Sequence, residues 1–84
     1  MSRQVLLVEW EDATGRLGWQ DESEAAGASV MLCTSVGILV SRNESRVVLA
    51  LTACDAEEMV SNTLVVPTRF IRKTKRLATL KGKP

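Results

Sequence analysis

Residues 30–53, VMLCTSVGILVSRNESRVVLALTA, decide the fold, because two runs of period-2 alternation flank a short polar segment. Residues 30–40 place Val30, Leu32, Thr34, Val36, Ile38 and Val40 on one side and Met31, Cys33, Ser35, Gly37 and Leu39 on the other. This pattern predicts a long and largely buried strand. Residues 42–45 are typical of a turn, and the alternation of residues 46–53 completes a hairpin. Gly37 indicates a bulge or a sharp bend, by which one strand can serve both sides of a small barrel.

Three further segments surround this hairpin. Residues 5–10 alternate as a strand, and residues 63–67 form another, which Pro67 closes because proline cannot donate to a ladder. Residues 20–29 predict one or two helical turns, which Gly27 keeps short.

Residues 69–80 fit two structures. As a helix they would carry an apolar stripe made of Phe70, Ile71, Thr74, Leu77 and Ala78. As a strand they would have no cleanly apolar face. We nevertheless favour a strand that follows a single 3₁₀ turn at residues 68–70, because the other strands need a partner for their edges.

The composition is that of one small folded domain. The chain has 84 residues and a mass of 9.2 kDa, which excludes an enzyme with a cleft between two lobes. Hydrophobic residues make up 45% and charged residues 25%, and no apolar run approaches the ~18 residues of a membrane span. Because residues 1–12 show no secretory signal, we expect a cytoplasmic protein in which Cys33 and Cys54 are unpaired, buried side chains.

The net charge of +1 conceals a division of the chain. Residues 1–68 carry four arginines and ten acids, whereas residues 69–84 carry seven lysines and arginines and no acid. Such a basic segment can attract phosphate groups, pair with acidic surface of the same or a neighbouring subunit, or remain solvated. Its end, residues 78–84, is a candidate disordered tail.

The residues needed for catalysis are nearly absent. The chain has no His to activate a nucleophile, and two separated thiols without His do not make a metal site. Glu9, Glu11 and Asp12 are close in sequence, but acids at the end of a strand ordinarily face solvent. Gly15 and Gly18 lack the Lys-Ser/Thr of a phosphate loop and indicate a turn. We therefore expect neither an enzyme nor a bound cofactor or metal.

The remaining candidates are binding residues. Trp10 and Trp19 both suit the core, but Trp19 follows a glycine in a loop and is the better candidate for stacking on a base. Arginine can bind two phosphate oxygens at once, and strand or turn hydroxyls can add contacts. The candidate ligand-binding residues are Trp19, Thr34, Ser35, Thr68, Arg69, Arg72, Lys73 and Lys75.

Four segments stand out along the chain: VEWEDATGRLGW, CTSVGILV, SRVVLALT and VVPTRFIRKTKRL. Together they resemble a family of short phage and prophage proteins of mostly unassigned role, over nearly the whole chain. The recurrent positions fall at Trp10, Asp12, Gly18, Trp19, residues 35–40, Pro67, Ile71 and Leu77. The resemblance implies a single mainly β domain over residues 1–84, a small five-stranded Sm-like or Src-homology-3-like barrel with a short helical turn. Ile38 and Thr74 depart from the pattern, which favours an aromatic and an apolar residue there.

A chain without titratable catalytic groups can act only by holding a partner. A small core gains from oligomerisation, so we expect a homo-oligomer with no membrane partner. The resemblance suggests a counter-defence protein that sequesters a host cyclic-nucleotide signal in the host cytoplasm without cleaving it. One alternative is an Sm-like nucleic-acid binder with a salt-dependent grip on the backbone. Another is a protein-interaction inhibitor of a host defence factor, which would bind no nucleotide.

Overall fold

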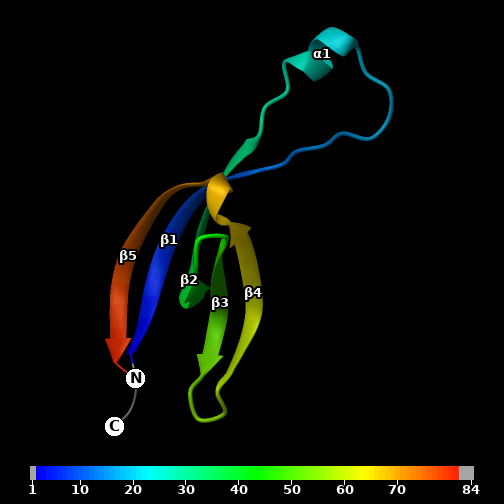
Figure 1. Ribbon diagram of the computed structural model, residues 1–84. Helices are drawn as coiled ribbons and strands as arrows, with labels where there is room; N and C mark the ends of the chain where they lie inside the picture. Colours follow the sequence, from blue (N-terminus) through cyan, green and yellow to red (C-terminus); the bar gives the residue numbers. More distant parts are fainter. Residues whose placement is uncertain (1, 82–84) are drawn as a thin grey trace.

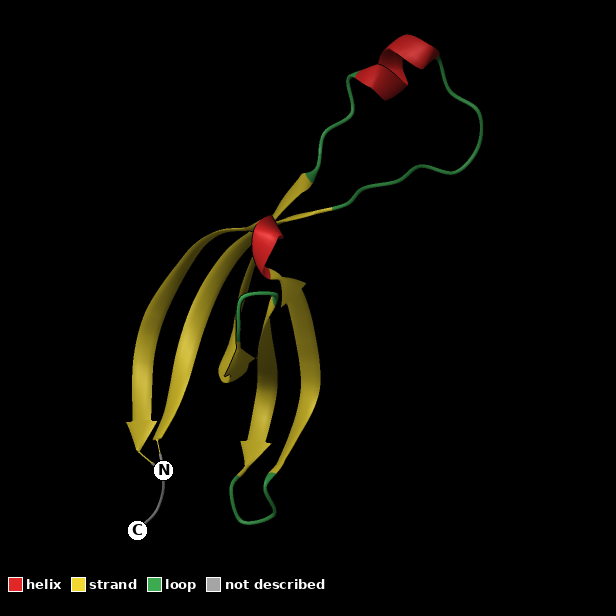
Figure 2. Ribbon diagram, in the orientation of Figure 1, coloured by secondary structure: helices red, strands yellow, loops and turns green. Residues whose placement is uncertain are grey.

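The computed structural model describes residues 2–81 and is mainly β, with five strands and one short helix (Figures 1 and 2). In chain order the elements are β1 (Ser2–Asp12), α1 (Glu22–Ala26), β2 (Met31–Arg42), β3 (Arg46–Cys54), β4 (Met59–Pro67), the 3₁₀ turn η1 (Thr68–Phe70) and β5 (Ile71–Lys81). Every strand pairing is antiparallel, and the order across the sheet is β4-β3-β2-β1-β5.

β2 connects the two halves of the sheet by bending, as the sequence predicts. Its first part pairs with β1 up to Ile38, and its last part pairs with β3. The register shifts between Leu39 and Ser41, so Val40 forms a bulge. At Gly37 a Cβ atom would lie 3.0 Å from Leu49 Cβ and 3.1 Å from the carbonyl oxygen of Ala50. A residue without a side chain therefore lets β3 approach at the bend.

The core lies on the concave face of this bent sheet. Alternation along β1 and β3 turns residues of both strands towards this face. Val8 of β1 and Val47 of β3 are almost fully buried there. Val66 of β4 pairs with Val47 and is also fully buried. Trp10, Leu39 and Ile71 pack against this cluster from the side.

The hydrogen-bonded sheet does not close into the predicted barrel, because β4 and β5 remain its two edges. β4 ends at Pro67, which has no N–H, and η1 then turns the chain towards β1. β5 pairs with β1 over almost its whole length. The two edges are thus joined through η1 rather than by a ladder.

The last segment of the chain is a strand, as favoured above, and begins with the predicted 3₁₀ turn. It is longer than predicted, because residues 78–81 continue β5 beside the beginning of β1. The prediction of a disordered tail is therefore wrong for these four residues, since pairing with β1 orders them. Residues 82–84 lie outside the described part of the chain.

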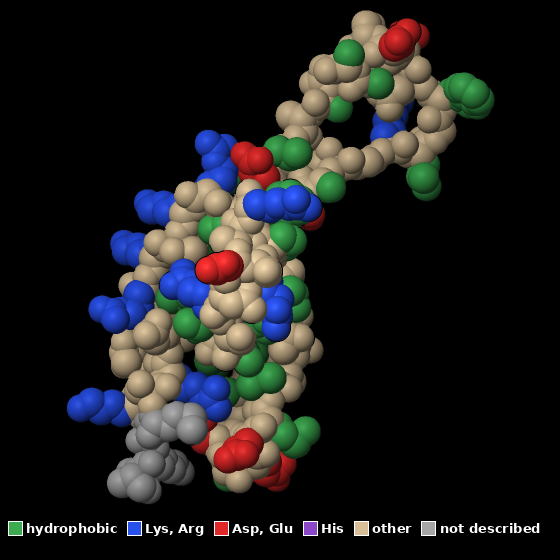
Figure 3. Space-filling view, viewed as in Figure 1, with side chains coloured by type: hydrophobic (Ala, Val, Ile, Leu, Met, Phe, Trp, Pro, Cys, Tyr) green, Lys and Arg blue, Asp and Glu red, His purple; other side chains and the backbone are tan. Residues whose placement is uncertain are grey.

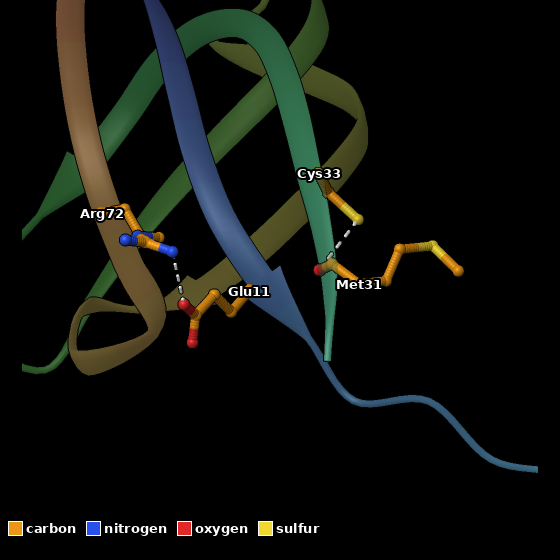
Figure 4. A network of polar contacts seen from close by, with 4 residues as sticks. All are labelled: Glu11, Met31, Cys33 and Arg72. Carbon is orange, nitrogen blue, oxygen red and sulfur yellow. Dashed lines mark hydrogen bonds and ion pairs between the residues drawn. The ribbon is translucent and has the colours of Figure 1, made fainter. Parts of the chain in front are cut away.

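Two predictions of burial are wrong. β2 was predicted to be largely buried, yet Met31, Leu32 and Val36 are exposed. Leu32 and Val36 are on the convex face of the sheet, which no second layer covers among residues 2–81. Cys33 is only half-buried, and Cys54 at the end of β3 is exposed; neither forms a disulfide. The Cys33 thiol donates a weak hydrogen bond to the Met31 carbonyl, 3.8 Å away, as Figure 4 shows.

The segment between β1 and β2, residues 13–30, extends away from the sheet and is here named the arm (Figure 1). It lengthens the molecule to 60 Å, against 22 and 20 Å in the other two directions. The predicted short helix is present as α1, but none of its residues is buried. The arm is held together at its base by a hydrogen bond from the Thr14 hydroxyl to the Ser29 carbonyl, 2.9 Å long.

Candidate anion-binding site

The turn between β2 and β3 is hydrogen-bonded to η1, and the candidate site lies beside this connection. Asn43 accepts hydrogen bonds through Oδ1 from the backbone N–H groups of Ser45 and Arg46, at 2.8 and 2.9 Å. Asparagine favours such turns because its side chain can replace a backbone acceptor. Thr68 of η1 donates its N–H to the Ser45 carbonyl at 2.9 Å and its hydroxyl to the Asn43 carbonyl at 3.4 Å.

A cavity of about 290 Å³ opens beside this connection. Val47 and Ile71 form its apolar part, and both belong to or pack on the core. The polar lining consists of Arg42, Asn43, Thr68 and Thr74. The lining thus combines one guanidinium, one amide and two hydroxyl groups with an apolar floor and contains no acid. This composition suits an anionic ligand that also has an apolar or aromatic part.

A row of cations extends from this cavity along η1 and β5; Arg69, Arg72, Lys73, Lys75 and Arg76 are named the basic strip. In Figure 3, Lys and Arg side chains project along this edge of the molecule. All five side chains belong to exposed residues. Lysine and arginine on an edge strand also discourage pairing with other chains, so this row has a structural role without any ligand.

Two members of the basic strip already have partners. Arg72 donates from Nη1 to Glu11 Oε1 at 3.0 Å, across from β5 to β1 (Figure 4). The Arg69 guanidinium lies 5.5 Å from the centre of the Phe70 ring, within reach of a cation–π interaction. Within residues 2–81, the ion pairs do not include Arg42, Lys73 or Lys75. These three cations keep their charge available for a ligand.

The structure separates the predicted binding residues. Thr34 and Ser35 lie on opposite faces of β2, and the Ser35 hydroxyl accepts a hydrogen bond from Trp10 Nε1 at 3.0 Å. The Ser35 hydroxyl therefore already has a partner, which packs against the core. Trp19 lies in the arm and is fully exposed, which agrees with its predicted availability. The arm extends away from the sheet (Figure 1), whereas Thr68 begins η1. Of the two tryptophans, Trp10 packs against the core, whereas Trp19 does not, because the arm does not pack on the sheet.

Of the predicted residues, only Thr68 lines the cavity, and Arg69 and Arg72 follow it in the chain. Sequence reasoning missed Arg42, Asn43 and Thr74. Asn43 lies in the turn, as predicted, whereas Arg42 is the last residue of β2, and nothing local shows that η1 packs against that turn. Thr74 was considered only as a departure from the resemblance, and the structure places it in the lining of the cavity.

Other kinds of site find no support in the described residues. Between residues 2 and 81, no three His, Cys, Asp or Glu side chains come together as metal ligands. No helix within the same range is long and apolar enough to cross a membrane. Comparison of the chain with family models, curated proteins and solved structures gives no match in any of the three.

Proposed function

We propose that this protein is a non-enzymatic binding protein of the Sm-like or Src-homology-3-like small-barrel class, which holds an anionic nucleotide ligand. The strand order β4-β3-β2-β1-β5, the bent β2 and the 3₁₀ turn between β4 and β5 support that class. The sheet lacks the ladder between β4 and β5 that would complete a barrel, so the likeness is one of topology.

The observation that carries the proposal is the lining of the cavity beside the basic strip. Arg42 can hold a phosphate bidentately, and the hydroxyls of Thr68 and Thr74 can donate to its remaining oxygens. Val47 and Ile71 offer an apolar wall for a base or sugar. The lining contains no carboxylate that could act as a general base, so the site supports binding and gives no support to turnover.

The size of the cavity limits what one copy can enclose. Small-molecule sites usually measure about 300–1,000 Å³, and this cavity measures about 290 Å³. One copy could surround a nucleotide-sized part of a ligand, and a second copy would complete a site for a cyclic dinucleotide. Sequestration of a host cyclic-nucleotide signal in the host cytoplasm, as a phage counter-defence protein, is the form of this function that we propose.

Titration calorimetry against cyclic di- and trinucleotides tests the proposal. We expect stoichiometric binding of one nucleotide class, and a loss of about 10- to 100-fold in affinity for Arg42→Ala, as for a hydrogen bond to a charged group. Arg46→Ala is the matched control, because Arg46 lies on the same turn but does not line the cavity. Failure of every nucleotide to bind would overturn the proposal, as would equal binding by Arg42→Ala and the wild type.

A nucleic-acid binder is the second candidate, and the length of the basic strip favours it. Exposed cations spaced along one strand can follow a phosphate backbone, and Lys81 continues the row at its far end. Here affinity should rise with oligonucleotide length and fall steeply with salt. Arg69→Ala should reduce the slope of log affinity against log salt by about 0.7–0.9 for each lost phosphate contact. Binding that is independent of length would exclude this candidate.

A further inference from the structure

The arm cannot be explained as part of the folded sheet. Leu17 is 99% and Trp19 101% exposed, although the burial of large apolar side chains away from water is favourable. α1 has five residues, far fewer than the ~12–15 that an isolated helix needs to persist in water. Besides the backbone hydrogen bonds of α1 and its two ends, the arm contains the Thr14–Ser29 hydrogen bond and an exposed ion pair between Arg16 and Glu24 at 3.5 Å. The conformation of the arm therefore calls for a surface on which it can pack.

The accessible surface area and the radius of gyration also indicate that the arm needs a surface on which to pack. A compact monomer of this mass should expose about 4,900 Å², whereas this chain exposes 6717 Å². The excess, about 1,800 Å² for one chain, is roughly twice the ~800 Å² that each partner buries in a standard protein–protein interface. The radius of gyration is 16.8 Å, against about 12 Å for a compact domain of this length.

The convex face of β1, β2 and β5 has the composition to receive the arm. Leu6 and Val8 point into the core, so Leu7 and Glu9 point to this outer face. Leu7 lies between Val36 of β2 and Lys75 of β5, and Glu9 lies between Thr34 and Lys73. Half-buried Leu7 and exposed Val36 thus lie beside two lysines that have no partner among the ion pairs of residues 2–81.

The charges of the arm and of this face are complementary. Residues 13–30 contain one arginine and three acids, Asp21, Glu22 and Glu24, which gives a formal charge of −2. The acids follow shortly after Leu17 and Trp19 in the chain, so an apolar contact would bring carboxylates towards Lys73 and Lys75. In Figure 1 the arm points away from its own sheet, which leaves the face of another copy as the surface within its reach.

We propose that the arm of one copy packs on the convex face of a second copy, with Leu17 and Trp19 on the apolar surface around Val36 and the arm acids beside Lys73 and Lys75. Two copies that exchange arms would bury both exposed tryptophans symmetrically. Gly18 has a φ of +91°, a conformation that side chains rarely adopt, and this turn sets the direction of Trp19. The proposal concerns assembly and holds whether or not the cavity binds a nucleotide.

Sedimentation velocity of the full chain over a range of concentrations tests the proposal. We expect the wild type to associate, and Trp19→Ser and Leu17→Ser to raise the dissociation constant by about 30-fold or more, as for central interface residues. Leu51→Ser is the matched control, because Leu51 is an exposed leucine of β3 outside the proposed contact. A wild type that stays monomeric throughout would overturn the proposal, and so would association that neither arm variant weakens.

A charge exchange tests the partner surface separately. Lys73→Glu with Lys75→Glu should dissociate the assembly, and adding Asp21→Lys with Glu22→Lys should restore it, because the signs are again opposite. The arm variants are exposed and should leave the circular dichroism spectrum unchanged, so loss of association is separable from unfolding. Dissociation that the second pair fails to reverse would overturn the proposed pairing of arm and face.

Discussion

The sheet and the arm both contain large apolar residues, but only the sheet buries them in a core. In the sheet, alternation directs Leu6, Val8 and Val47 into one cluster that excludes water. In the arm, Leu17 and Trp19 meet nothing of their own chain. The fold is made by the strands within residues 2–12 and 31–81, whereas the large apolar side chains of the arm contribute nothing to the core.

The largest difference in the free energy of unfolding should appear between substitutions of two leucines of β3. Leu49 is 3% exposed and Leu51 is 69% exposed, two residues further along the same strand. Leu49→Ala should lower the free energy of unfolding by about 2–5 kcal/mol, because it leaves a cavity in the core. Leu51→Ala should change it by less than about 0.5 kcal/mol. Urea denaturation measures both, and equal losses would show that the core lies elsewhere.

Substitutions of two glycines, one in the sheet and one in the arm, test the same comparison. Gly37→Ala should cost about 1–3 kcal/mol, since its Cβ would press on Leu49 and on the Ala50 carbonyl at the bend of β2. Gly15 of the arm has no atom within 4 Å of a Cβ, so Gly15→Ala should leave thermal unfolding almost unchanged. A tolerated Gly37→Ala would mean that the bend is looser than described.

Adjacent residues of β2 provide a smaller contrast. Ser35→Ala removes the acceptor of the half-buried Trp10 indole and should cost about 1 kcal/mol. Thr34→Val, on the exposed opposite face, should have little effect on stability because it keeps the shape and strand preference of threonine. Chemical denaturation of the two variants, followed by tryptophan fluorescence, distinguishes them. Comparable destabilisation would contradict the assignment of the two faces.

The smallest effect on stability should come from removal of the ion pair between Glu11 and Arg72 on the convex surface. Glu11→Gln removes the partner of Arg72 and should lower stability by less than about 1 kcal/mol, because both side chains are well exposed. The loss should disappear when salt is added, since salt screens exposed charges. Thermal unfolding at low and high ionic strength provides the measurement. A large, salt-independent loss would show a buried role for Glu11.

The sequence predicted the strands well because alternation is a local property. Residues 30–40 and 46–53 had a period of two, and the need for an edge partner correctly favoured strand for the segment after Phe70. The same alternation could not show whether a second layer covers the outer side of β2, so the burial of Val36 and of Cys54 was overestimated. It also could not show that β4 and β5 stay unpaired.

The site was predicted less well than the fold because contacts distant in sequence create it. Thr68 reaches Asn43 and Ser45 across more than twenty residues, and this packing brings Arg42 to the cavity. Sequence reasoning selected Thr34 and Ser35 together, although neighbours on a strand point to opposite faces. Arg69 to Lys75 were identified as a basic segment from charge alone, and they do form one exposed strip.

Amide hydrogen exchange at two protein concentrations tests the division between sheet and arm most directly. At high dilution, amides of β1 and β3 should be protected, whereas those of residues 13–30 should exchange freely, since the arm makes no contact with the core. At high concentration the arm amides should become protected, while those of β1 and β3 keep their protection. Arm amides that are protected in the dilute monomer, or unprotected at every concentration, would contradict this account.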